Sequence, residues 1–411
     1  MSQEFDLGCI RGAAGPAGPA GPQGPAGPVG ATPSISIGQV VTVAAGEEPY
    51  VTRRAGSGDE QPVLDFGLPG ADGAMTAAVY DSRGRHQDVF AYCDALAGRR
   101  TATVVVAAAD SRDRARADLV CGGEHDQLTV AQAIAALPAG GGRVVLLEGS
   151  YILSRYGVEA GTNGSFSLLP VTRDNVSLTG QGPATVFKLA DGAAGYNSVF
   201  LIDVQAGGFC AADLTLDGNA SRNEAEITGL RVGQDQSDAR LERLQVRDCS
   251  GVGLQSYGSD ALLDACLCRD CGCGVKLSGR ARVRSCRLRD NGRGLYIYGG
   301  QQLIEGCAVS GSGSCGIYAD GGSFCMIRAN TLWGQPVGVS LTDMSDAVVS
   351  GNLIFRDAAG GSWGSDEYPL LVTACARPHL VGNYLRGKAA SLSSCEGAVL
   401  YYGGTDWNPT A

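Results

Sequence analysis

Two adjacent stretches of the chain read Leu244-Gln-Val-Arg-Asp-Cys-Ser-Gly-Val-Gly-Leu254 and Cys266-Leu-Cys-Arg-Asp-Cys-Gly-Cys-Gly-Val-Lys-Leu277. The same motif returns three more times, at 286–297, 307–317 and 330–339. The apolar residues three positions before each copy are spaced by 22, 20, 21, 23 and 22 residues, and they are Leu241, Leu263, Val283, Ile304, Ile327 and Val349. A constant period of this length indicates stacked supersecondary units.

Each unit is too short for a helical hairpin, and its apolar residues alternate at a period of two. Val246, Cys268 and Leu288 lie two residues after the start of their copies. Period two indicates strands, and the glycines between the strands indicate corners. We therefore predict an all-β fold, a right-handed parallel β-helix with coils of about 21–23 residues.

The columns of the repeat predict which residues face inward. The first residues of successive copies are Leu244, Cys266, Cys286, Cys307, Asn330, Asn352 and Asn383. We expect an internal stack in which each Asn amide bonds to its neighbour in the next coil. Two positions earlier stand Glu242, Asp264, Arg284, Glu305 and Arg328. Because adjacent strands lie about 4.8 Å apart, this column predicts an outward ladder of opposite charges from Asp264 onward.

Composition excludes several classes of partner. The chain has 411 residues, 62 glycines and a net charge of −10, which disfavours nucleic acid and anionic membranes as partners. No apolar run approaches about 18 residues, so no membrane insertion is expected. Met1–Leu7 lacks the basic and apolar regions of a signal peptide. We expect export, if it occurs, by lysis or by a dedicated machine.

The 15 cysteines are predicted to be mostly reduced, buried, small apolar residues. A zinc site at Cys266, Cys268, Cys271 and Cys273 is the alternative. However, Cys266 and Cys268 already occupy apolar columns, and Cys271 aligns with Cys249 and Asn291. A closed zinc site needs four ligands that converge on one point. We therefore predict no metal and no cofactor.

The N-terminal region is collagen-like. Glycine occupies every third position from Gly12 to Gly30, with proline in many of the remaining positions. Only glycine fits the axis of three polyproline II chains, so a triple-helical stalk is predicted, and a flexible Pro/Gly linker is the alternative. We divide the chain into an attachment segment and stalk (1–32), a small β module with a second short triplet run (33–73), a linker and helical capping region (74–140) and the β-helix (141–411).

Local patterns place further elements. Strands are expected over 33–43 and 62–68, with a polar segment, 44–60, between them. A helix is expected within 79–98, and a second one is capped by Asp126 and covers the open end of the β-helix. The first full strand of the solenoid is predicted over 142–151, long excursions over 156–172, 190–198, 218–227 and 357–368, and a shield for the last coils over 387–402.

The chain resembles phage and prophage tail fibres and tailspikes. The opening Phe5-Asp-Leu-Gly-Cys-Ile-Arg-Gly12 with its triplets is similar to the start of tail fibres from phages of Gram-positive hosts. The segments from Ala117 to Gly123 and from Leu147 to Tyr151 resemble the beginning of pectate-lyase-like β-helices. The resemblance implies a homotrimer in the virion tail. It would attach to other tail or baseplate proteins through its N-terminus and turn the β-helix toward the bacterial surface.

Catalysis on such a fold requires clustered carboxylates or a basic residue near a bound uronate. The signatures of pectin hydrolases and lyases are absent, and His86, His125 and His379 are far apart in the chain. The remaining catalytic candidates are carboxylates in two loops, Asp213, Asp217, Glu224, Glu226, Asp366 and Glu367. Two carboxylates about 5–9 Å apart hydrolyse glycosides. Solvated surface carboxylates are the commoner case, so no catalytic residue is assigned and activity is left open.

Aromatic residues are the candidates for contact with carbohydrate. Tyr296 and Tyr318 share an outward column with Gln255 and Lys276, and Trp333, Trp363 and Tyr368 lie near the C-terminal coils. The recurring pairs Arg247-Asp248, Arg269-Asp270 and Arg289-Asp290 indicate supports for a turn rather than an anion-binding stripe.

These observations favour a trimeric fibre or spike of a phage, or one derived from a prophage, that recognises bacterial surface polysaccharide by multivalent binding. It would be made in the host cytoplasm and act outside the cell. Two alternatives are open: a polysaccharide depolymerase, hydrolase or lyase, on the same fold, and a structural spacer of a tail assembly.

Overall fold

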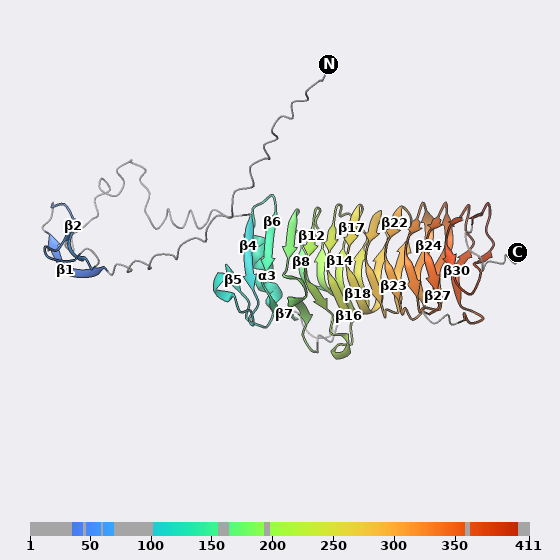
Figure 1. Ribbon diagram of the computed structural model, residues 1–411, viewed down its shortest axis with the longest axis horizontal. Coiled ribbons are helices and arrows are strands. Elements are labelled where there is room, and N and C mark those ends of the chain that lie inside the picture. Colours follow the sequence, from blue (N-terminus) through green and yellow to red (C-terminus); the bar gives the residue numbers. More distant parts are fainter. Residues whose placement is uncertain are drawn as a thin grey trace, which may run out of the picture. The chain divides into compact units, whose positions relative to one another are not determined.

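The computed structural model describes residues 35–43, 47–58, 61–69, 102–154, 164–192, 198–357 and 362–401 (Figure 1). The chain divides into two compact units, Met1–Leu96 and Ala97–Ala411. The collagen-like run of residues 12–30 and the helix expected within 79–98 lie outside the described residues. No helix in the described part of the chain is long and apolar enough to cross a membrane.

The first unit contains a three-stranded sheet of order β1-β3-β2, formed by β1 (Ser36–Val43), β2 (Tyr50–Arg53) and β3 (Val63–Pro69). β1 pairs with β3 in parallel, and β2 pairs with β3 antiparallel. The two expected strands are confirmed. The expectation of a polar connection over 44–60 was wrong at β2, because four residues are too short a pattern to predict a strand that only pairing with β3 stabilises.

The second unit begins with β4 (Thr103–Ala107), a 3-10 turn (Arg114–Arg116), β5 (Leu119–Val120), α3 (Asp126–Ala136) and β6 (Gly142–Leu146). Val130, Ile134 and Leu137 are buried, as the helical pattern predicts, and α3 contacts β4, β6, β7 and β8. The cap of α3 is His125 in the left-handed region, and not Asp126. The buried Asp126 carboxylate instead accepts the N–H groups of Gly123 and Ile152, both at 2.8 Å.

Successive coils of the second unit stack side by side, and all of its described strand pairs are parallel (Figure 1). Its first sheet has 13 strands, in the order β34 (Val399–Tyr401), β31 (His379–Val381), β28 (Val348–Ser350), β25 (Met326–Arg328), β22 (Gln302–Glu305), β19 (Ala281–Arg284), β17 (Ala261–Asp264), β15 (Arg240–Glu242), β12 (Cys210–Ala212), β9 (Val176–Thr179), β6, β4 and β5.

The 18-stranded second sheet of this unit consists of two ladders. The β7 ladder contains β7 (Gly149–Leu153), β10 (Thr185–Leu189), β13 (Thr215–Asp217), the first parts of β16 (Gln245–Ser256) and β18 (Leu267–Leu277), β20 (Arg287–Arg289), β23 (Ala308–Ser310), β26 (Thr331–Trp333), β29 (Leu353–Phe355) and β32 (Tyr384–Leu385). The β8 ladder contains β8 (Ser165–Val171), β11 (Ser198–Val204), β14 (Glu226–Val232), the last parts of β16 and β18, β21 (Arg293–Tyr298), β24 (Cys315–Ser323), β27 (Val337–Ser345), β30 (Tyr368–Thr373) and β33 (Ser391–Ser393).

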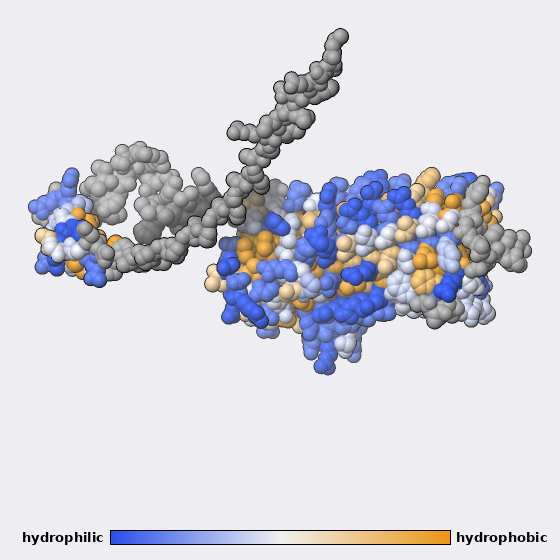
Figure 2. All heavy atoms as spheres, viewed as in Figure 1, coloured by the Kyte–Doolittle hydropathy of each residue, from blue (hydrophilic) through white to orange (hydrophobic). Residues whose placement is uncertain are grey.

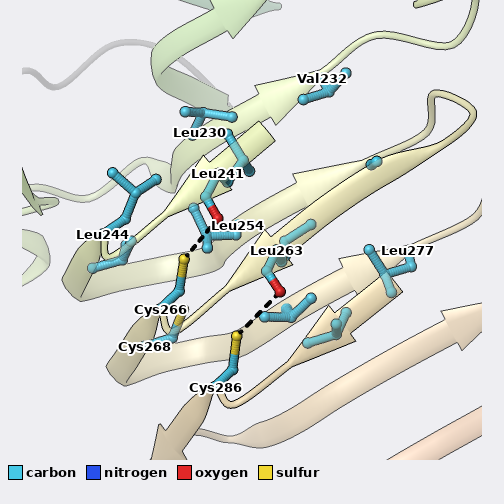
Figure 3. Close-up of a cluster of buried hydrophobic side chains, with 14 of the residues drawn as sticks. Leu230, Val232, Leu241, Leu244, Leu254, Leu263, Cys266, Cys268, Leu277 and Cys286 are labelled. Carbon is cyan, nitrogen blue, oxygen red and sulfur yellow. Dashed lines mark hydrogen bonds between the residues drawn. The ribbon is translucent and has the colours of Figure 1, made fainter. Parts of the chain in front are cut away.

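The 13-stranded sheet and the two ladders enclose a core in which apolar residues of successive coils stack in columns. On the β8 ladder, Leu254, Val275 and Leu295 pair in register and are buried. At one corner the Cys266 and Cys286 thiols donate to the carbonyls of Leu241 (3.2 Å) and Leu263 (3.7 Å), as Figure 3 shows. The cysteines of this stack therefore act as buried apolar residues with weak hydrogen bonds to backbone carbonyls.

The asparagine stack follows the cysteines in the same column and is also confirmed. Asn330 Nδ2 donates to Asn352 Oδ1 at 3.0 Å, and Asn352 Nδ2 donates to Asn383 Oδ1 at 2.8 Å. Each amide also donates to a backbone carbonyl, which for Asn352 is that of Ile327. Outside the core, the predicted charge ladder is present, with ion pairs Arg284–Asp264 (2.8 Å) and Arg328–Glu305 (2.6 Å).

Three predictions about segments require correction. The strand expected over 142–151 is two strands, β6 and β7, separated by the corner at Leu147 and Glu148. The shield expected over 387–402 includes β33 and β34, which pair with β30 and β31 and so add another coil. Part of the excursion expected over 156–172 is the coil strand β8.

Candidate functional site

A column of polar and aromatic residues follows the outer face of the β8 ladder. Gln255, Lys276, Tyr296 and Tyr318 pair in register in successive coils, as the repeat predicts. The rings of Tyr296 and Tyr318 are stacked, with centroids 5.3 Å apart and planes inclined by 22°. Both rings are half-buried, so their edges and hydroxyl groups remain accessible.

Arg293 lies against both tyrosines. Its backbone pairs with Cys273 and Cys315 at the start of the β8-ladder strands. Its guanidinium carbon is 5.1 Å from the Tyr296 ring centroid and 4.9 Å from that of Tyr318. The Lys276 ammonium lies 5.5 Å from the Tyr296 centroid. Cations at these distances interact favourably with aromatic rings.

Arg293 differs from most arginines of the solenoid in lacking a carboxylate partner among the described residues. Arg243 binds Asp213 at 2.6 Å, and Arg280, Arg284, Arg328 and Arg377 are also paired with carboxylates. The Arg293 Nε is buried without a hydrogen-bond partner. Its positive charge is therefore held in place by aromatic rings and is not neutralised within the described part of the chain.

The edge of this surface carries one carboxylate. Asp320 pairs in register with the exposed Tyr298 in the column next to Tyr296 and Tyr318. Burial, followed by the nearby Asp320 charge, raises the pKa of Tyr296 above its ordinary value. The Tyr296 hydroxyl therefore stays protonated at neutral pH. We call the group that consists of Lys276, Arg293, Tyr296, Tyr298, Tyr318 and Asp320 the tyrosine patch.

Trp333 belongs to a second aromatic pair on the β7 ladder. It pairs in register with Phe355, and the ring centroids lie 6.0 Å apart with planes only 7° from parallel. Earlier residues of the same outward column are Arg247, Arg269 and Arg289. Arg269 and Arg289 pair with Asp270 and Asp290, the residues that follow them, as the recurring motif predicts. Arg247 instead binds Asp217 of the preceding coil and not Asp248.

The other two C-terminal aromatic candidates, Trp363 and Tyr368 at the start of β30, are already in contact with other parts of the chain. Trp363 is only 8% exposed, and its indole N–H donates to the Arg386 carbonyl at 2.8 Å. The Lys388 ammonium lies 3.9 Å from the Tyr368 ring centroid and donates to the carbonyl of Glu367 at 2.6 Å. The expectation that Trp363 is an exposed sugar contact needs correction, because its indole is already used in packing.

The candidate catalytic carboxylates are held by cations or lie separately on the surface. Asp217 is buried, binds Arg247 at 2.8 Å and accepts the Asn219 N–H at 3.0 Å. Glu367 binds Arg356 at 2.9 Å, and the N–H of Gly364 followed by the Arg356 charge keeps its pKa below the ordinary value despite some desolvation. A general acid needs a raised pKa, so Glu367 is not suited to that role. Glu224, Glu226 and Asp366 are exposed.

Sequence reasoning missed a buried ion pair in the same outward column as the tyrosine patch. Asp203 is 0% exposed and pairs with Arg231 through contacts of 2.8 and 2.9 Å. It also accepts hydrogen bonds from Ser167 (2.6 Å) and Gln205 (2.8 Å). The guanidinium carbon of Arg231 lies 3.8 Å from the centroid of the Phe200 ring. A lone aspartate within the apolar strand 198–204 was the available signal.

The cysteines proposed as alternative zinc ligands have separate partners. The thiol of Cys266 donates to Leu241, that of Cys271 to Arg269 and that of Cys273 to Val275, each at 3.2 Å. Within the described ranges, no group of three or more His, Cys, Asp or Glu side chains is arranged to hold a metal ion.

Comparison with known proteins agrees with this geometry. The family model described as "Right handed beta helix region" matches residues 204–332 and 271–404. The fold is a right-handed β-helix. A search of curated protein sequences finds no match.

The similar solved structures include proteins with different names and roles. The A-module of a mannuronan C-5 epimerase from Azotobacter vinelandii is 18% identical with a TM-score of 0.51, over 68% of this chain and 93% of that one. A family 28 exopolygalacturonase of Yersinia enterocolitica is 10% identical with a TM-score of 0.48, over 68% and 73%. The tailspike of E. coli bacteriophage HK620 is 11% identical with a TM-score of 0.44, over 68% and 63%. At these identities the likeness establishes the fold alone.

Proposed function

We propose that this protein is a trimeric tail fibre or spike of a phage, or one derived from a prophage, that binds bacterial surface polysaccharide through the tyrosine patch. The stacked pair Tyr296–Tyr318, with Arg293 against both rings, is the observation that carries the proposal. The collagen-like triplets and the N-terminal resemblance support the fibre and the virion location. In this arrangement the N-terminus attaches to the tail.

The tyrosine patch offers the two kinds of contact that sugars need. The exposed Tyr298 provides apolar surface for the C–H groups of a pyranose, and the tyrosine hydroxyl groups and Asp320 provide hydrogen-bonding partners. Lys276 and Arg293 add positive charge, so acidic sugars are favoured over neutral ones. Three such sites on one trimer bind a repetitive polymer by avidity, without high affinity at each site.

The test is binding of the purified full-length chain to capsular and wall polysaccharides from candidate hosts. We expect co-elution of protein and polymer on a sizing column. The double variant Tyr296→Ala, Tyr318→Ala should weaken this binding about tenfold or more, because stacking surface is lost at every copy. Tyr384→Ala is the matched control, since it removes an exposed tyrosine from β32 on the other ladder.

The same sizing-column experiment distinguishes the alternative functions. Intact polymer that co-elutes with the wild type, but not with the double variant, supports recognition by the tyrosine patch. Polymer that becomes shorter would identify a depolymerase. Equal binding by the wild type and the double variant would show that the binding site lies outside the tyrosine patch. If the protein is a spacer, phage particles that lack residues 141–411 of this chain would bind cells as well as complete particles.

A further inference from the structure

One face of the small sheet in the first unit carries six apolar side chains, together with Thr42 beside Leu68 and Arg53 beside Leu64. Leu64, Phe66 and Leu68 of β3 lie on the same side, because alternate residues of a strand share a face. The register places Ile37 beside Leu64, and Val40 and Val51 on either side of Phe66. The irregularity between Ile37 and Val40 keeps both of these residues on this side, although they are three apart in the chain.

Most of these side chains are uncovered in a single chain, whereas Leu64 and Phe66 are half-buried. Ile37 is 71% exposed, Val40 56% and Val51 58%, and Leu68 is also exposed. Figure 2 shows apolar, orange atoms at the surface of this unit. A three-stranded sheet with a bare apolar face has little to stabilise it, because hydrophobic stabilisation comes from apolar area removed from water. A module of this size, below about 40 residues, usually needs a partner.

The opposite face satisfies its own groups. Asp65 accepts the Gln39 N–H at 2.5 Å and binds Arg54 at 2.6 Å. The ring of Tyr50 covers Gly67 so closely that a Cβ there would lie 2.3 Å from the ring carbon Cε1. Val41 also lies on this face, beside Gly67. The larger group of exposed apolar side chains in the described part of this unit is therefore on the face that contains Phe66, although Tyr50 (44%) and Val41 (41%) are also exposed on the opposite face.

The flanking sequence indicates which partner covers it. Glycine recurs at every third position before the module, from Gly12 to Gly30, and again from Gly67 to Gly73. This pattern belongs to a helix of three chains. Because β1 and β3 are parallel, the run before β1 and the run after β3 attach at opposite ends of the sheet. Three chains that pass through both runs would bring three copies of the sheet together.

We propose that the apolar faces of three β1–β3 sheets pack against one another around the axis of the trimer. Ile37, Val40, Val51, Leu64, Phe66 and Leu68 would form this shared core. The occupant of each face is thus the same face of two further copies of the chain. Such a core aligns the three chains, which gives short collagen-like runs a common starting register. This inference rests on the trimer of the proposed function and assigns its interface.

The first experiment measures the mass of the full-length protein by sedimentation equilibrium at micromolar concentration. The wild type is expected to be a trimer. The double variant Val40→Lys, Val51→Lys should fall about threefold in mass, toward the 42.1 kDa of one chain, because six buried ammonium groups in one trimer would have to be desolvated. Val41→Lys is the matched control, since this valine is 41% exposed but lies on the opposite face, and it should remain trimeric.

Cross-linking tests the same contact without introducing charge. In the single variant Val51→Cys, a short bismaleimide should link copies of the chain into dimers and trimers on a denaturing gel, and in Val41→Cys it should not. A monomeric wild type would overturn both this inference and the trimer of the proposed function. If the wild type is trimeric, two results would overturn this inference and leave the trimer of the proposed function intact. One is a double lysine variant that also stays trimeric, and the other is a Val41→Cys variant that cross-links as well as Val51→Cys. Neither readout involves glycan binding.

Discussion

Asn330 and Asn352 occupy the same corner of successive coils and are joined by a buried hydrogen bond of 3.0 Å from Asn330 Nδ2 to Asn352 Oδ1. The Asn352 oxygen also accepts the backbone N–H of Asn330 at 2.9 Å. One carbonyl oxygen thus satisfies two donors of the preceding coil. In these coils an asparagine is therefore needed at the corner, because an apolar side chain of similar size offers neither the acceptor nor the donor that the neighbouring coils use.

Replacing Asn352 by Leu should destabilise the C-terminal coils strongly. The change leaves the Asn330 backbone N–H without its acceptor and removes the side-chain bonds to the Ile327 carbonyl, Asn330 Nδ2 and Asn383 Oδ1. A buried polar group that loses its partner costs about 1–3 kcal/mol, so we expect a loss of about 3 kcal/mol or more in the free energy of unfolding. Urea unfolding followed by the fluorescence of Trp333 and Trp363 measures it. Arg284→Ala, on the exposed charge ladder, should have a much smaller effect; equal effects would contradict the prediction.

The ion pair of Asp203 and Arg231 predicts how stability depends on pH. Burial alone would raise the pKa of Asp203, but hydrogen bonds from Arg231, Ser167 and Gln205, together with the Arg231 charge, outweigh it and leave this pKa below the ordinary value. The unfolded carboxyl group titrates near about pH 4. The stability that Asp203 contributes is therefore complete above that pH and is lost as the pH falls through the folded-state pKa.

Asp203→Asn should consequently cost about 3 kcal/mol at pH 7, as expected when one partner of a buried pair is removed. The difference between wild type and variant should shrink as the pH is lowered from about 6 to 3. Urea midpoints at a series of pH values measure this difference. Asp366→Asn, at an exposed carboxylate, is the control and should show a small difference throughout. A difference for Asp203→Asn that does not change with pH would exclude the linkage.

The buried thiols should be unreactive in the folded chain. Burial raises the pKa of Cys315 and of Cys325 to about 12, so little thiolate is present at neutral pH. Iodoacetamide at pH 8 should leave both unmodified in the native protein and modify both in denaturant, as read by peptide mass spectrometry. Modification of either in the native protein at the rate of a small free thiol would show that these coils open readily.

The charge of Arg293 should select acidic polymers. In Arg293→Leu we expect a larger loss of binding for an acidic polysaccharide than for a neutral one, because no described carboxylate already neutralises this guanidinium. Added salt should weaken the binding of acidic polysaccharide by the wild type until it approaches that of the variant. Arg289→Leu removes a guanidinium that is 3.1 Å from Asp290 and serves as the control. Equal losses for acidic and neutral polymers would assign Arg293 a packing role only.

Most of the fold followed from the sequence because the coils between about Leu241 and Val349 have nearly constant length. A residue about 21 positions further along then lies directly above its predecessor, so one column predicts many contacts. The asparagine stack, the charge ladder and the Tyr296–Tyr318 pair were all found in this way. The faces of the strands followed from the alternation within each copy.

Only the tertiary structure decided the remaining features. The coils before Leu241 are interrupted by loops of different length, so the 28 residues between Asp203 and Arg231 do not show that the two share a column. The reach of Arg293 to both tyrosines depends on side-chain conformation, and the apolar face of the first unit depends on an irregular register between β1 and β3. The sequence by itself therefore determined the solenoid and its columns through regular repetition. Where that repetition fails, register and side-chain packing decide which residues meet, and these are properties of the folded chain.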